Sequence, residues 1–391
     1  MLDNSFSLIF PQIDELVNQA FTVTSFSYRS PRTGNNAQAM VLPTYEILRR
    51  SDLSSNMQLI TSKLKSLGFI PFLRAHPTQE SRGLLFILPM NERMLDTKQN
   101  LKTPLVLFIF TVLSVIFSGI NIWEILSRID PGLNLIVTIA LYLIGIMGIV
   151  GIHELGHLVA SRLHGINASL PYFIPNPFSF GTFGAFITQK SPSKSKNSLF
   201  DVGLSGPIFG FVVALFFTIW GLFLSFTVSS LPSLGNNIFF TDFLQFNSPT
   251  RYRIPLFELL AFLIFPKDYY HSEIILHPLA LAGYIGLLLT GLNLIPIGQT
   301  DGGHIARSLM SEKNHRIVTY ISAGILTILG FFFFAILLLL MYSQTGHPGP
   351  LDDISSVSNS RKIITILGLV LTVLCLPFPV EIYNGILQLF V

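Results

Sequence analysis

The sequence predicts an α-helical polytopic membrane protein with about six transmembrane helices, preceded by a small N-terminal α+β soluble domain. Three observations predict this fold. Only 12% of the 391 residues are charged and 50% are hydrophobic, which is about half the charged fraction of a typical globular protein. The charge-free residues are grouped into runs long enough to cross a bilayer, which takes about 20 apolar residues. The first 102 residues have no such run and hold 19 of the 45 charges.

The predicted N-terminal domain, residues 1–102, shows the local patterns of strands and of one helix. Phe21–Tyr28 alternates as a strand does, and Asp52–Leu67 has helical spacing after a capping residue. Phe69–Leu73 and Gly83–Leu88 predict further strands. The beginning of the chain has neither the basic segment nor the cleavage site of a signal peptide, so we expect no removable leader.

Six charge-free runs in the rest of the chain predict six spans. Their bounds and lengths are 103–123 (21 residues), 131–153 (23), 202–241 (40), 274–300 (27), 317–351 (35) and 363–380 (18). The two longest runs have Pro-, Gly- or Ser-rich tails, so each is expected to supply one helix and part of a loop. We therefore predict a six-span membrane domain at residues 103–391, with its core motifs in 130–320.

Basic residues near the ends of the spans predict the orientation, because cytosolic loops carry an excess of Lys and Arg. With six spans, the side of the N-terminal domain collects ten such residues, and the other side collects six, including Arg361 and Lys362. We therefore expect an integral multi-pass protein of the lipid bilayer with both termini in the cytosol. The net charge of +3 and the scattered basic residues give no footprint for nucleic acid. The single cysteine excludes an intrachain disulfide.

The second predicted span ends in a charged motif, HELGH. His153 and His157 are four residues apart and share a helix face, which lets two imidazoles hold one Zn²⁺, while Glu154 lies beside them to take a proton from the attacking water. In a soluble chain such a pattern is often ordinary helix surface. Within an apolar span that alternative weakens, because three polar side chains would be buried without partners.

A third zinc ligand is expected from the end of the fourth predicted span, because catalytic zinc sites usually have three protein ligands. Asp301 follows that run and precedes two glycines. Spans two and four run in the same direction, so the two histidines and Asp301 lie at similar depth near the cytosolic side. The alternative for Asp301 is a helix cap or a loop carboxylate. The sequence thus predicts one Zn²⁺ per chain.

Five segments, in chain order, resemble the site-2 proteases, a family of polytopic zinc metalloproteases that cleave substrates within or beside the membrane. They are HELGH (153–157), PYFIPNP (171–177), GTFGAFI (181–187), FDVGLSGPIFG (200–210) and NLIPIGQTDGGH (293–304). The resemblance implies that His153, His157 and Asp301 bind zinc and that Glu154 is the general base.

The same resemblance implies roles for further residues. Asn293 would face the site and stabilise the oxyanion or hold the substrate. Gly181, Thr182, Phe183 and Gly184 would form a re-entrant loop that pairs with an unwound substrate strand, since a transmembrane helix keeps its peptide groups in its own hydrogen bonds. The alternative for this loop is a glycine turn between two spans.

The expected function is that of an intramembrane zinc metalloendopeptidase acting on membrane-embedded protein or peptide substrates, as in regulated intramembrane proteolysis. One alternative is a zinc or ion transporter, which usually distributes ionisable groups over several helices and has an internal repeat. A second is a catalytically inactive relative that acts as a membrane scaffold, which would not need Glu154. His304, three residues after Asp301, is expected to support the site rather than to bind metal. The sequence leaves the substrate and the oligomeric state open.

Overall fold

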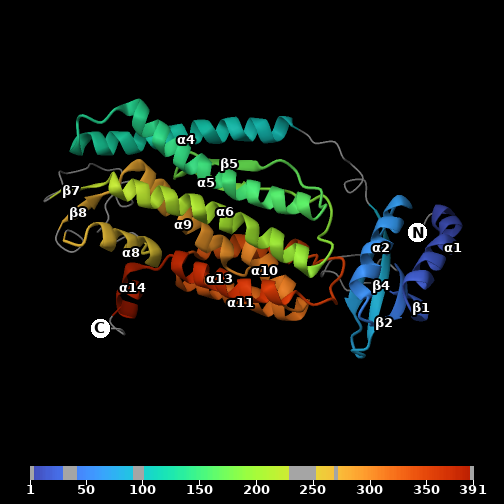
Figure 1. Ribbon diagram of the computed structural model, residues 1–391. Helices are drawn as coiled ribbons and strands as arrows, with labels where there is room; N and C mark the ends of the chain where they lie inside the picture. The colour runs from blue at the N-terminus through green and yellow to red at the C-terminus, as the bar shows by residue number, and fades with distance from the viewer. Residues whose placement is uncertain (1–3, 30–41, 91–100, 229–251, 268–271, 388–391) are drawn as a thin grey trace.

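The computed structural model describes residues 4–29, 42–90, 101–228, 252–267 and 272–387. The described chain has an N-terminal region, residues 4–90, and a helical region, residues 101–387. Figure 1 shows the N-terminal region at one end of the helical region and strands β7 and β8 at the opposite end.

The N-terminal region is a four-stranded antiparallel sheet covered on one face by two helices. Its elements are α1 (Asn4–Ala20), β1 (Val23–Arg29), β2 (Leu42–Leu48), α2 (Leu53–Ser66), β3 (Phe69–Ala75) and β4 (Arg82–Pro89). The strand order is β1-β2-β4-β3. Alternate residues such as Tyr45, Ile47 and Leu85 point to the helices and form one core with them. The three predicted strands and the predicted helix are confirmed; α1 and β2 were not predicted.

The helical region contains the predicted membrane segments. Its elements are α4 (Lys102–Ile129), α5 (Leu135–Leu163), β5 (Tyr172–Asn176), β6 (Gly181–Phe186), α6 (Lys196–Phe223), β7 (Phe226–Val228), α8 (Pro255–Ile264), β8 (Glu273–Ile275), α9 (Pro278–Leu294), α10 (Asp301–Leu309), α11 (Glu312–Ile328), α12 (Phe332–Thr345), α13 (Asn359–Cys375) and α14 (Val380–Leu387). Among the described helices, α4, α5 and α6 are long and apolar enough to cross a membrane.

Helix α9 is the centre of the helical region. It is buried along nearly its whole length and packs against α5, α6 and α13. The outer faces of the long helices are apolar and exposed, as at Leu105, Phe110 and Leu113 of α4. An apolar surface of this extent suits contact with lipid rather than water.

The fifth predicted span is wrong. Residues 317–351 do not form one helix, because the chain reverses at Gly330, whose φ is +90°, a conformation that glycine adopts readily. The two resulting helices, α11 and α12, run antiparallel: His315 near the start of α11 contacts Tyr342 near the end of α12, with ring centroids 5.8 Å apart. The length of a charge-free run therefore does not show whether its residues form one helix or two.

This reversal changes the direction of the last helix. Because α12 returns to the end occupied by the N-terminal region, α13 begins there: Arg361 in its first turn donates to Asp201 of α6, with Nη2–Oδ2 2.6 Å. The prediction that placed Arg361 and Lys362 at the far end is therefore wrong. Helix α14 lies at the end opposite the N-terminal region (Figure 1), so the structure also contradicts the expectation that both termini share one side.

Candidate metal centre and active site

Helix α5 carries the HELGH motif in its second half. The helix begins at Leu135, where the side chain of Asn134 accepts a hydrogen bond from the Val137 N–H at 3.1 Å, and it continues without interruption to Leu163. His153, Glu154 and His157 are all buried. The i, i+4 spacing places the two histidines on the same helix face.

Asp301 is the first residue of α10, and two local features hold it there. The Thr300 side chain caps the helix by accepting the Gly303 N–H at 3.1 Å. A Cβ at Gly302 would lie 2.0 Å from the Leu294 carbonyl oxygen, so only glycine lets α10 start directly against the end of α9. Asp301 is thereby brought from the end of α9 to the face of α5.

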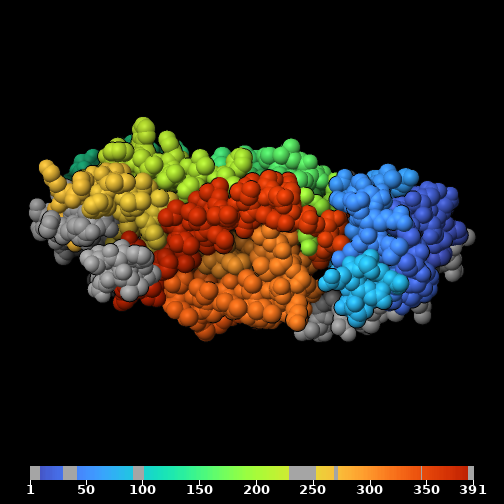
Figure 2. All heavy atoms as spheres, turned by 60° about the horizontal axis from the view of Figure 1, so that its bottom comes forward, coloured from blue at the N-terminus to red at the C-terminus, as the bar shows by residue number. Residues whose placement is uncertain are grey.

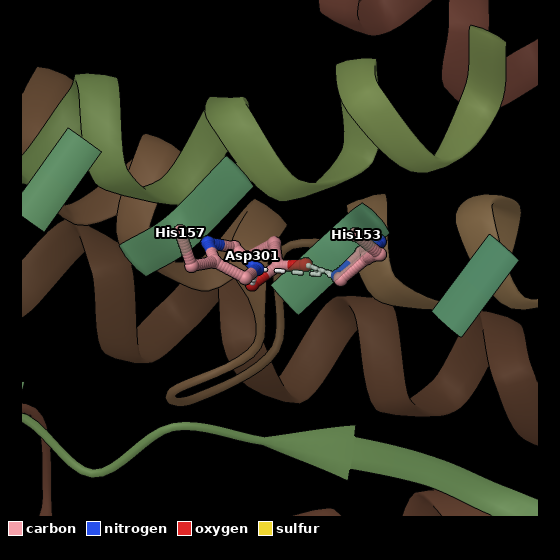
Figure 3. A group of neighbouring side chains, drawn as sticks. All are labelled: His153, His157 and Asp301. Atoms are coloured by element: carbon pink, nitrogen blue, oxygen red, sulfur yellow. Dashed lines mark hydrogen bonds and ion pairs between the residues drawn. The ribbon is translucent and has the colours of Figure 1, made fainter. Parts of the chain in front are cut away.

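Three ligand-type side chains converge between α5 and α10 (Figure 3). The Nε2 atoms of His153 and His157 are 3.1 Å apart. Each lies 3.2 Å from an oxygen of Asp301, His153 from Oδ2 and His157 from Oδ1. Two ligand atoms of a tetrahedral zinc site, each about 2.0–2.1 Å from the metal, are about 3.3 Å apart. The three residues therefore have the donor types and the separations that zinc requires.

The orientation of the His157 ring suits metal binding. The Nδ1 of His157 donates to the Val202 carbonyl oxygen at 2.7 Å, which leaves the Nε2 lone pair directed at the centre.

Glu154 provides an independent observation that the centre is built for a ligand. The residue is 3% exposed, and within the described residues its Oε2 is buried with no hydrogen-bond partner. A buried carboxylate oxygen without a partner is costly. A water held by a metal in the adjacent cluster would satisfy it, so the donor set and the orphaned oxygen together fit zinc.

Three glycines of α6 allow this centre to be packed tightly. Cβ atoms built at Gly206 and Gly210 would lie 2.1 Å from His157 Nε2 and 2.9 Å from His153 Nδ1, and one at Gly203 would lie 2.9 Å from the Asp301 carbonyl oxygen. Sequence reasoning did not assign them this role. The available signal was their spacing of three and four residues, which marks a close helix contact in membrane proteins.

The remaining predicted residues lie on elements beside the cluster. Asn293 is half-buried in the last turn of α9, next to the residue that contacts the start of α10. Gly181–Gly184 begin strand β6, which pairs antiparallel with β5. His304 lies one turn after Asp301, and its Nδ1 is 2.9 Å from Nε2 of His347.

Comparison with known proteins identifies the family. The model of peptidase family M50 matches residues 141–339, just over half of the chain. The chain belongs to peptidase family M50. This is the family of the site-2 proteases, so the resemblance carried by the five sequence segments is confirmed. The matched residues include His153, His157 and Asp301.

The relatives of this M50 member bear the names of zinc metalloproteases. The chain is 29% identical over 237 residues to the probable zinc metalloprotease EGY1, chloroplastic, of Arabidopsis thaliana, covering 59% of this chain and 41% of the relative. It is 30% identical over 236 residues to the probable zinc metalloprotease EGY2, chloroplastic, of the same plant, with 59% and 40% covered. The chain thus spans about two fifths of the length of these relatives. No solved structure matches.

Proposed function

We propose that this M50 member is an intramembrane zinc metalloendopeptidase that hydrolyses peptide bonds of membrane-embedded substrates. The observation that carries the proposal is the convergence of His153, His157 and Asp301 within 4.8 Å, with Glu154 buried beside them. The family membership and the names of the relatives support the same chemistry.

The proposed roles follow from the position of each side chain. His153, His157 and Asp301 hold the zinc. Bound zinc supplies Lewis acidity, polarising the scissile carbonyl and lowering the pKa of water. Glu154 accepts the proton of the attacking water and passes it to the leaving amine, as a general base and then a general acid. No covalent bond to the protein is formed.

Asn293 is proposed to hold the substrate carbonyl. It occupies the last turn of α9, and α10 starts directly against the end of that helix through Gly302. Its side-chain amide can donate to an oxygen that becomes negatively charged in the transition state, the usual role of a neutral amide in such sites.

Strand β6 is proposed to dock the substrate. Its partner among the described residues is β5, and we propose that a substrate strand adds to the other edge of β6. Thr182 is buried and fixes the strand, its hydroxyl donating to the Ile174 carbonyl oxygen at 2.9 Å. Phe183 is 69% exposed, and Gly184 has no atom within 4 Å of an added Cβ. The segment therefore combines a fixed backbone with open space beside it.

Gly184→Val should slow cleavage about fivefold, the effect of losing about 1 kcal/mol of substrate hydrogen bonding, with zinc content unchanged. A side chain at Gly184 obstructs the docking edge, but φ at this residue is +96°, so the substitution also strains the backbone. Gly68→Val is the matched control, because Gly68 has φ +83° and equally open space but lies in the N-terminal region. Equal rates for wild type and Gly184→Val would show that β6 is only a connector.

We propose that the N-terminal domain, residues 1–102, and the metal centre lie at the cytosolic side. Arg361 pairs with Asp201 at the end of the bundle that carries the N-terminal region, and Lys362 follows it. Moving these two residues changes the basic count from ten against six to twelve against four, which favours this orientation more strongly.

Reconstituted protein tests the function directly. In liposomes that contain a membrane-embedded reporter peptide, the wild type should cleave the reporter, and a zinc chelator should abolish the cleavage. The same preparation is assayed for zinc flux across the bilayer. Flux that depends on His153 and His157, without cleavage, would identify a transporter; neither activity would indicate an inactive relative.

A further inference from the structure

Residues 347–354, between α12 and α13, contact both the N-terminal region and α10, and we call this segment the strap. Figure 2 shows the red C-terminal part of the chain touching the blue N-terminal region. The strap pairs with the edge strand β3: the Leu73 N–H donates to the Leu351 carbonyl oxygen at 2.8 Å, and the Asp353 N–H donates to the Leu73 carbonyl oxygen at 3.2 Å. The strap thus forms an isolated parallel β-bridge with the edge strand of the N-terminal sheet.

Side chains strengthen this attachment. The Arg74 guanidinium on β3 donates to two carbonyl oxygens of the strap, that of Pro350 at 2.8 Å and that of Pro348 at 3.0 Å. Ile354 packs against the core between the sheet and its helices. At Gly83 on β4, an added Cβ would lie 2.8 Å from Ile354 Cδ1. The strap is therefore held to the N-terminal region by backbone, polar and apolar contacts.

The other side of the strap holds α10. Asp353 accepts two hydrogen bonds from Arg307, at 2.9 and 2.6 Å, and Arg307 is only 1% exposed. His347 accepts the Gly349 N–H at its Nδ1, so its Nε2 carries the hydrogen and donates to His304 at 2.9 Å. A buried arginine left without its carboxylate would be strongly destabilising, so the strap and α10 are tightly joined.

These contacts lie on the same short helix as a proposed zinc ligand. Asp301 begins α10, and His304 and Arg307 follow at successive turns. With a rise of 1.5 Å per residue, Arg307 is about 9 Å along the helix axis from Asp301. A single helix of this length moves as a unit, so a contact that fixes Arg307 and His304 also fixes the position of Asp301.

We propose that Arg307 and Asp353 are positioning residues for the metal centre, and that Arg74 extends this support to the N-terminal region. The strap sets α10 at the depth at which Asp301 meets the two histidines of α5. The inference rests on the proposed zinc site, and it makes the N-terminal region part of the support of that site rather than a separate module.

Zinc affinity tests the proposal without any measurement of cleavage. In purified full-length protein, the zinc dissociation constant is measured by competition with a chelator. We expect Asp353→Asn to weaken zinc binding about tenfold, the lower end of the effect of removing a residue that supports a metal ligand. Arg74→Ala should weaken it less, because Arg74 contacts the strap and not α10. Glu124→Gln is the matched control, because it removes the carboxylate from the exposed ion pair between Glu124 and Arg128 on α4.

Hydrogen exchange of the wild type distinguishes this role from a purely structural one. Zinc binding would not alter exchange at the strap if the strap were not coupled to the metal centre. If the strap couples the two regions, zinc binding must stabilise the strap by the same free energy with which the strap stabilises zinc binding. Zinc loading should therefore slow exchange of the Leu73 and Asp353 amides, which form the hydrogen bonds between β3 and the strap. In Arg74→Ala this protection should shrink.

The outcomes separate this proposal from the proposed function. If Asp353→Asn does not fold, Arg74→Ala and the wild-type exchange experiment still decide. Unchanged zinc affinity in the folded variants, together with no effect of zinc on the strap amides, overturns the positioning role whatever the cleavage result. Strap-dependent zinc binding without cleavage of any reporter would support the positioning role and contradict the protease function.

Discussion

Glu154→Gln should reduce cleavage of a membrane-embedded reporter by about 10²- to 10⁴-fold, the usual contribution of a general base. The amide has nearly the shape of the carboxylate but cannot accept the proton of the attacking water. The side chain is 3% exposed and its Oε2 is unpaired within the described residues, so the substitution should disturb few existing bonds. Zinc content should stay at the wild-type value, because Glu154 is not a proposed ligand.

The matched control for this prediction is Glu124→Gln, the same change on the exposed part of α4. Cleavage rate and zinc content are measured on the same preparations of wild type and both variants. A Glu154→Gln protein that cleaves at the wild-type rate would rule out this residue as the base. A loss of zinc in Glu154→Gln would show instead that the carboxylate supports the metal.

The group of His153, His157 and Asp301 was the part of the site most accessible to sequence reasoning. His153 and His157 are neighbours on one helix, so their proximity depends only on helix periodicity. Placing Asp301 beside them required one further inference, that spans two and four run in the same direction. The corresponding helices, α5 and α9, do both run toward the N-terminal region (Figure 1). The polar residues stood out because the surrounding segments are apolar.

The packing around the cluster could not be predicted in the same way. Gly203, Gly206 and Gly210 matter through what lies opposite them on other helices, and this depends on helix crossing rather than on local pattern. The pairing of Arg307 with Asp353 joins residues 46 positions apart, and no sequence periodicity indicates it.

The errors in the fold have similar causes. Strand β2 contains Pro43, and a proline within a run argues against a central strand, although Thr44 and Glu46 alternate with Tyr45 and Ile47. Helix α1 contains Pro11 and has no basic residue in its last turn, so the usual signals of a helix are weak. The run 317–351 was misread because Gly330 was counted as one more apolar residue, although its positive φ reverses the chain.

Purified wild-type protein should contain about one zinc per chain, and Gly206→Ala should remove most of it. The new methyl group would lie 2.1 Å from His157 Nε2, whereas carbon contacts are favourable at about 3.5–4.0 Å. Either the ring or α6 must therefore move by about 1.4 Å. Because α6 is packed against α5 and α9, we expect the ring to move, which displaces a ligand from the centre. Alanine is favoured over glycine within a helix by about 1 kcal/mol, so loss of helix propensity cannot explain a loss of zinc.

Elemental analysis of three variants checks this expectation. Gly151→Ala makes the same change within α5, where nothing lies within 4 Å of the added Cβ, and it should retain zinc. The double variant His153→Ala, His157→Ala should lose the metal, because only Asp301 would remain of the three proposed ligands. Full zinc in the double variant would contradict the assigned ligands. Full zinc in Gly206→Ala alone would contradict the expected displacement of His157 and would mean that α6 moves away to accept the methyl group.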